Sequence, residues 1–172
     1  MVDAAASFDG NRVAANEISA RSMRADQGRW AATASDGAGL ADYIQFCASA
    51  LFAPAQSASW VNNWAAATGA DMVVATLTCD ARPALSLALE VVRRGPFKIA
   101  RFAGGRHANG NFAAADPRFL PAIDASAIRS MFKAIARMRP DIDLISLERL
   151  LPNLNGVVNP LAALPSCSPR MR

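Results

Sequence analysis

Histidine and cysteine are scarce in this sequence, and their scarcity excludes several kinds of site. His107 is the single histidine, and the three cysteines, Cys47, Cys79 and Cys167, are far apart. This spacing fits neither a disulfide framework nor a zinc site. We therefore expect free thiols in a reducing compartment and no bound metal.

Sequence patterns that mark whole classes of function are also missing. Basic residues form no concentrated stripe with interleaved aromatics, although the net charge is +4, so we expect no binding to nucleic acid. No apolar run reaches the roughly 18 residues that a membrane span needs, and the N-terminus lacks a secretory signal. There is no Walker-type loop, no Gly-x-Ser-x-Gly elbow and no histidine pair on a helix. The sequence predicts a soluble cytoplasmic protein.

Large apolar residues are distributed unevenly along the 172-residue chain. Residues 1–38 are rich in Ala, Ser, Asp, Arg and Gly, which predicts a disordered N-terminal arm. Periodic apolar patterns run from residue 39 to residue 151 and indicate one domain. Prolines then recur without periodicity, so residues 152–172 are expected to form an irregular tail.

Three segments carry helical signals, at residues 40–51, 57–69 and 124–139. Helical spacing places five apolar residues of the first segment on one face, namely Leu40, Tyr43, Ile44, Cys47 and Leu51. A glycine ends the second helix and a proline stops the third. The candidate capping residues are Ser57 or Ser59 for the second helix and Asp124 or Ser126 for the third.

Four segments carry strand signals, at residues 71–79, 85–91, 97–102 and 142–147. Leucines alternate with smaller residues in the second, which is typical of a half-buried strand. The first three are joined by short turns and should be antiparallel. The predicted fold is therefore of the α/β or α+β kind, with a mixed, mainly antiparallel sheet flanked by helices.

The strongest functional signal is the loop at residues 102–112, which follows the third predicted strand. It holds three glycines, two asparagines and the only histidine, and polar loops at the end of a sheet often carry binding groups. Two tryptophans four residues apart on the second helix share a face and could place one ring at a pocket rim. The candidate substrate-binding residues are Arg106, His107, Asn109, Asn111, Trp60 and Trp64.

Each of these residues also has a structural interpretation. The loop can be a wide turn, the tryptophans can pack in the core, and His107 can be a hydrogen-bonding strut. His107 is the one side chain that titrates near neutrality, but a general base also needs an orienting partner. The sequence identifies no catalytic residue.

Several segments resemble the N-terminal half of the CelD-like, FemAB-related acetyltransferases of the GNAT superfamily, which are associated with cellulose biosynthesis. The likeness covers about residues 40–165 and is carried by Trp60-x-x-x-Trp64 and by residues 104–111, 141–146 and 159–165. The resemblance implies a GNAT-like fold and acetyl-CoA as the acyl donor. It also implies a small-molecule amine as acceptor, with transfer by direct attack on the thioester.

The sequence departs from that family in three ways. Gly110 stands where the family's phrase more often has an aromatic or apolar residue. The match to the pyrophosphate-binding signature, at residues 101–106, fails at its last position, and the chain ends about where a second lobe should begin. We therefore expect a truncated N-terminal lobe that is inactive alone and lacks its second lobe. One alternative is a non-catalytic module that binds a protein partner. Another is a complete small acetyltransferase with a coenzyme A cleft between splayed fourth and fifth strands.

Overall fold

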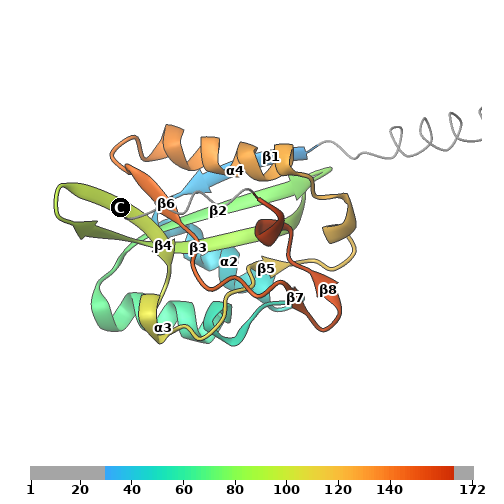
Figure 1. Cartoon of the computed structure of the whole chain (residues 1–172), viewed down its shortest axis with the longest axis horizontal. Coiled ribbons are helices and arrows are strands. Elements are labelled where there is room, and N and C mark those ends of the chain that lie inside the picture. The colour runs from blue at the N-terminus through green and yellow to red at the C-terminus, as the bar shows by residue number, and fades with distance from the viewer. Residues whose placement is uncertain (1–29, 165–172) are drawn as a thin grey trace, which may run out of the picture.

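A six-stranded sheet runs through residues 30–164, the part of the chain that the computed structural model describes (Figure 1). The strands are β1 (Trp30–Ser35), β2 (Asp71–Cys79), β3 (Arg82–Arg94), β4 (Phe97–Phe102), β5 (Ala114–Ala115) and β6 (Leu144–Ser146), and β7 (Asn153–Leu154) and β8 (Val157–Val158) form a separate hairpin. The helices are α2 (Leu40–Cys47), α3 (Ala58–Thr68) and α4 (Ala125–Met138). Single 3-10 turns are η1 (Gly37–Gly39), η2 (Pro54–Gln56), η3 (Gly105–His107), η4 (Leu120–Ala122) and η5 (Pro160–Ala163).

The strand order is β1-β2-β3-β4-β6, with β5 paired to β3. Neighbouring strands from β1 to β4 are antiparallel, whereas β6 is parallel to β4. This pair is parallel because α4 lies between β4 and β6 in sequence. The helix carries the chain back to the end of the sheet where β4 began, so β6 runs in the same direction as β4. The predicted mixed, mainly antiparallel sheet with flanking helices is confirmed.

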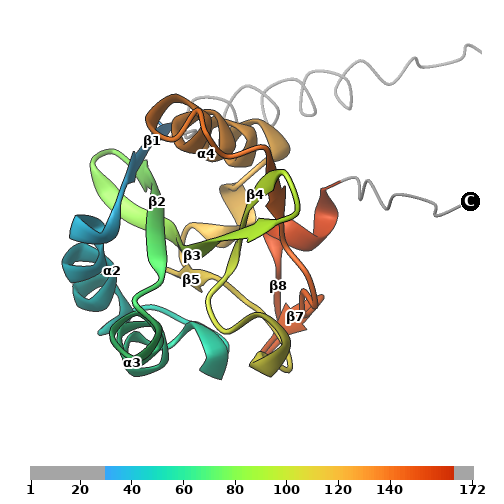
Figure 2. The ribbon, with the colours of Figure 1, turned by 90° about the vertical axis from the view of Figure 1, so that its left-hand side faces the viewer.

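Helices cover both faces of the sheet, α4 on one side and α2 with α3 on the other (Figure 2). Consequently β3 is buried on both faces from Ala84 to Glu90. Leu87 belongs to the core cluster that contains Met131 of α4, and Ala88 belongs to the cluster that contains Val61 of α3. The prediction that this strand is half-buried was wrong. Its sequence alternates in side-chain size rather than in polarity, so the alternation does not mark one face as exposed to solvent.

The helix signals located all three helices. Ser57 caps α3 by accepting a hydrogen bond from the backbone of Trp60, and Gly69 ends it in the left-handed region at φ 63°. Asp124 caps α4. The first helix is shorter than predicted. Tyr43 and Cys47 of α2 are buried, but Ile44 is exposed and Leu51 lies beyond the helix, where it pairs with Ala115.

The ordered domain extends beyond residues 39–151 at both ends. Strand β1 lies inside the predicted disordered arm, and every residue from Trp30 to Ser35 pairs with β2. The expected irregular tail contains the β7–β8 hairpin and the buried residues Asn159 and Leu161. Both segments are poor in periodic signal and gain order through pairing and packing with the sheet. Residues 1–29 and 165–172 of the predicted arm and tail lie outside the described residues.

The described residues include two buried free cysteines, Cys47 and Cys79, while Cys167 lies outside them. Within residues 30–164, no group of three or more His, Cys, Asp or Glu side chains is placed to hold a metal ion. None of the helices in this range is both long enough and apolar enough to cross a membrane.

A charged network joins the end of α4 to the sheet. The Arg139 guanidinium donates to both carboxylate oxygens of Asp71 at 2.8 Å and to Asp141 at 2.8 and 2.9 Å. Lys98 Nζ donates to Asp141 at 2.7 Å. Hydrogen bonds from Arg139 hold the pKa of both carboxyl groups below its usual range.

We expect the Arg139→Met variant to be about 1 kcal/mol less stable at neutral pH, because the network is only partly buried. A lowered pKa stabilises the fold above the ordinary carboxyl pKa of about 4, and this contribution is lost as the pH falls through the folded-state value. Urea unfolding between about pH 5 and pH 2 should therefore show a shallower loss of stability in the variant than in the parent. An equal slope in both proteins would contradict this role for Arg139.

Candidate functional site

The loop at residues 103–113 is an excursion from the sheet. It leaves after β4 and returns at β5, and both strands pair with β3. Gly104 and Gly105 adopt positive φ angles of 92° and 45°, and the chain then forms the single turn η3. A Cβ atom at Gly104 would lie 2.8 Å from the indole of Trp60. Gly104 therefore lets the backbone approach this side chain closely, and Gly105 does the same for the guanidinium of Arg101, which a Cβ there would meet at 2.8 Å.

Trp60 and Trp64 form an aromatic stack on α3 beside this loop. Their ring centroids are 6.2 Å apart and the rings are nearly parallel, at 9°. The ring of His107 lies 5.8 Å from that of Trp64, and Trp60 Nε1 donates to the carbonyl of Ala103 at 3.3 Å. The structure thus brings together three of the six candidate residues, from a helix and a loop far apart in sequence.

Two charged residues outside the six candidates complete this group, and of these only Arg101, as the first residue of the 101–106 match, had been noted in the sequence. The Glu90 carboxylate accepts hydrogen bonds from Trp64 Nε1 at 2.9 Å and from Arg101 Nε at 3.0 Å. Glu90 is 4% exposed, whereas the Arg101 side chain is 39% exposed. Glu90 and Arg101 are direct cross-strand neighbours. We call Trp60, Trp64, Glu90, Arg101 and His107 the tryptophan–glutamate cluster.

A signal for Glu90 was present in the sequence. It is the only charged residue in the apolar run from position 84 to position 92. A lone carboxylate in a buried strand requires a partner, because an unpaired buried charge is costly. The partner itself could not be identified from sequence, since it depends on the register between β3 and β4.

Asn111 lies apart from the cluster and has a structural role. It is buried, its Oδ1 accepts from Gln56 Nε2 at 3.1 Å, and its Nδ2 donates to the carbonyl of Glu148 at 2.9 Å. Its backbone pairs with Arg149 and Leu151. Asn111 therefore ties the loop to two other segments, as the structural interpretation of this loop required.

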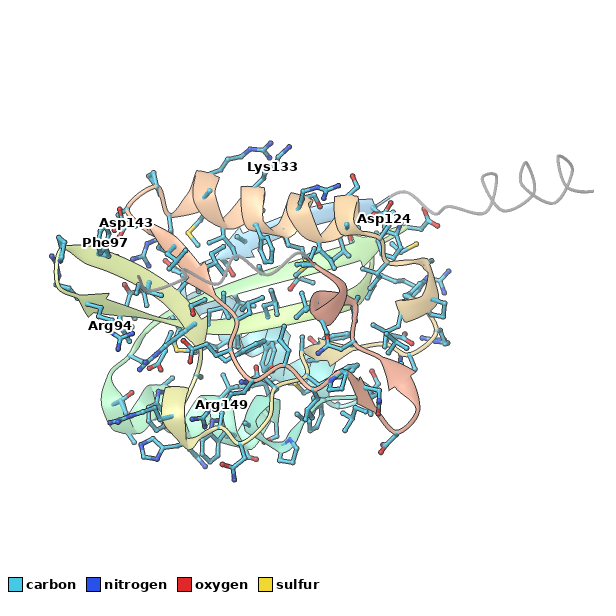
Figure 3. All side chains as sticks on the ribbon, in the orientation of Figure 1. Arg94, Phe97, Asp124, Lys133, Asp143 and Arg149 are labelled. Atoms are coloured by element: carbon cyan, nitrogen blue, oxygen red, sulfur yellow. The ribbon has the colours of Figure 1, made fainter. Side chains whose placement is uncertain are left out.

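Arg106 and Asn109 are both exposed. The carbonyls of Arg106 and Ala108 accept hydrogen bonds from the guanidinium of Arg149 at 2.9 and 3.0 Å. Figure 3 shows Arg149 close to this loop. A side chain from the segment after β6 thus holds the outer part of the loop in place.

The cluster combines an aromatic surface with one cationic group. Glu90 is engaged by two donors, so it positions Trp64 and Arg101 rather than acting as a free base. Arg101 uses only Nε for Glu90, and its two terminal nitrogens make no hydrogen bond within residues 30–164. Such a guanidinium can donate to a carboxylate or phosphate, while the indole and imidazole rings can stack on a flat or apolar group.

We expect the Arg101→Met variant to be about 1–2 kcal/mol less stable than the parent, since it leaves the buried Glu90 carboxylate with one donor. Partial exposure of Arg101 keeps the effect below that of a fully buried pair. Tryptophan fluorescence should also change, because Glu90 anchors Trp64. The exposed Arg106→Met variant is the control, and equal stability of the two variants would argue against the Glu90 contact.

A separate groove of about 670 Å³ lies between α2, β1 and the segment after β5. It is lined by both polar and apolar groups and contains an ion pair in which Arg118 holds the pKa of Asp116 below its usual range. None of the six candidate residues lines it. Its lining includes Thr33, Ser35, Asp42, Phe46, Asp116 and Arg118.

Comparison of the chain with protein-family models, with curated proteins and with solved structures found no match. The resemblance to acetyltransferases therefore stays a hypothesis that rests on the sequence motifs.

Proposed function

We propose that this chain is the N-terminal lobe of an acyl-CoA-dependent N-acetyltransferase, which transfers an acetyl group from acetyl-CoA to an amine. We further propose that it does not perform the transfer alone. The order of elements supports this proposal most directly. Antiparallel strands from β1 to β4 are followed by α4 and by β6 parallel to β4, which is consistent with a GNAT-like fold.

Because a fold can host many activities, the site must also be compatible with the proposal. The tryptophan–glutamate cluster lies where β4 ends, and it offers Arg101 to an anionic group and aromatic rings to a flat one. It offers no oriented base. Glu90 is already paired, and the His107 ring makes no orienting hydrogen bond within residues 30–164. These contacts favour ligand positioning over proton transfer.

The region beyond β4 and β6 argues against a self-sufficient small acetyltransferase. Such an enzyme was expected to hold coenzyme A between two splayed strands. Here three residues of each strand pair, from Ile99 with Leu144 to Arg101 with Ser146. Beyond them, hydrogen bonds from Arg149 and Asn111 link the two chain segments. This favours a lobe that works with a second one.

Isothermal titration calorimetry of this chain with acetyl-CoA tests whether the lobe binds the acyl donor without a second lobe. We expect no binding tighter than a Kd of about 1 mM, which corresponds to about −4 kcal/mol. Tight binding would contradict a lobe that lacks the thioester site. The coding sequence after residue 172 provides an independent test, because a lobe predicts an in-frame continuation into a second α/β lobe.

A non-catalytic interaction module is the second candidate function, and it is favoured by the outer edge of β6, which pairs with no other strand among residues 30–164. Both candidates predict association through uncovered apolar surface, so a clean monomer in gel filtration would weaken both. Only the acetyltransferase lobe predicts a second lobe downstream. An unrelated sequence or an immediate stop there would favour the interaction module.

A further inference from the structure

The short strand β6 stands at an edge of the sheet, and its sequence is apolar at Leu144 and Ile145. The strand order ends at β6, so its outer side pairs with no strand among residues 30–164. The run at 142–147 carries apolar residues on both faces, Ile142 and Leu144 on one and Ile145 and Leu147 on the other, with Asp143 and Ser146 as its polar members. No proline or lysine interrupts it, although edge strands commonly carry such residues to prevent further pairing.

Apolar surface flanks this edge on both faces of the sheet. On the α4 side, a groove of about 380 Å³ is lined by Phe132, Ile135, Ile142 and Ile145 among others. On the opposite side, Leu144 is 55% exposed and Phe97 is 57% exposed. Figure 3 shows Phe97 next to Asp143, which immediately precedes β6. A strand added at this edge would cover apolar surface on both faces.

The charges around the groove indicate what such a strand carries. Arg129 and Lys133 of α4 line it, and both are exposed. The only acidic residue in the lining is Asp143, and its carboxylate already accepts from the backbone of Lys98 at 2.7 Å. These two basic residues therefore favour acidic side chains beside the apolar part of the groove. A second copy of the chain would bring the same basic residues to this edge, which disfavours a homodimer built on β6.

We propose that the outer edge of β6 binds an extended segment of a partner protein as an additional strand of the sheet. The segment alternates acidic side chains, which face Arg129 and Lys133, with apolar side chains, which cover Leu144. Main-chain hydrogen bonds supply the binding and the side chains supply the selectivity. This surface does not depend on acetyl transfer and serves either function proposed above.

The probe is the synthetic peptide acetyl-Glu-Val-Glu-Val-Glu-Val-amide, titrated into the isotopically labelled chain and followed by NMR. We expect amide shifts in β6 and in the part of α4 that faces it. A lysine-for-glutamate peptide should bind more weakly, and a peptide N-methylated along its pairing edge should not bind. Shifts confined to other surfaces, equal binding of the N-methylated peptide, or no binding at about 5 mM peptide would overturn the proposal.

Helix α4 offers a matched set of variants. Arg129, Lys133 and Arg137 are all exposed at four-residue spacing, but Arg137 does not line the groove. The double variant Arg129→Glu, Lys133→Glu should weaken binding of the acidic peptide about tenfold, since each exposed pair contributes up to about 1 kcal/mol. Arg137→Glu should change it less than about twofold. An equal loss of peptide affinity in the double variant and in Arg137→Glu would indicate a general charge effect. It would contradict binding of the peptide at the outer edge of β6.

Discussion

The Gly104→Ala variant is expected to be about 2–4 kcal/mol less stable than the parent protein. Gly104 has a φ angle of 92°, which costs about 1 kcal/mol for a residue with a side chain. The new methyl group would also lie 2.8 Å from Cζ2 and 2.9 Å from Nε1 of Trp60. The indole cannot move away freely, because it is bonded to Ala103 and stacked on Trp64. Urea unfolding followed by tryptophan fluorescence measures the loss.

Gly69→Ala is the matched control for this prediction. Gly69 also has a positive φ angle, of 63°, but nothing lies within 4 Å of its added Cβ. It should lose only the conformational term of about 1 kcal/mol. The Trp60→Ala background should remove most of the difference between the two variants, because the clash disappears with the indole. Equal destabilisation by Gly104→Ala and Gly69→Ala would show that the clash with Trp60 contributes nothing to the loss of stability.

The Asn111→Leu variant is expected to lose about 2–4 kcal/mol of stability. Asn111 is buried and bridges the Gln56 side chain and the Glu148 carbonyl at 3.1 and 2.9 Å. Leucine has a similar size but no hydrogen-bonding group, so it removes a partner from each of these groups. Because Asn111 joins the loop to two other segments, η3 and the ring of His107 should also become more mobile. Denaturant unfolding and hydrogen exchange of the loop amides report these two effects.

Asn109→Leu is the control for Asn111→Leu, since both residues lie in one loop but Asn109 is exposed. We expect its stability to change by less than about 0.5 kcal/mol. If binding of a ligand to the cluster depends on loop position, Asn111→Leu should weaken it and Asn109→Leu should not. A large loss of stability in Asn109→Leu, or no loss in Asn111→Leu, would contradict the structural role assigned to Asn111 alone.

Local sequence signals predicted most of the secondary structure because their physical basis is local. Ser57 and Asp124 cap helices through their own neighbouring backbone, and Gly69 ends a helix through its own φ angle. The three central strands were delimited by turns. Strand β1 was missed because its alanines and small polar residues carry weak periodicity, and its order comes from pairing with β2.

The sequence indicated part of the candidate site. It singled out Trp60, Trp64 and His107, which the fold brings together. It also grouped Asn111 with them, although this side chain faces Gln56 and Glu148 instead. Position in a loop does not reveal the direction of a side chain, so neighbours in sequence can serve ligand contact and structure separately.

The sequence by itself determined which segments become helices and central strands, and it marked the glycine-rich loop as a distinct feature. Tertiary structure alone decided that Glu90 contacts Arg101 and Trp64, that Asn111 links the loop to other segments, and that β6 ends the strand order of the sheet within the described part of the chain. The physical reason is that capping and periodicity act within a few residues. Strand register and the pairing of a buried charge depend instead on residues far apart in the chain, whose contacts form only when the whole sheet assembles.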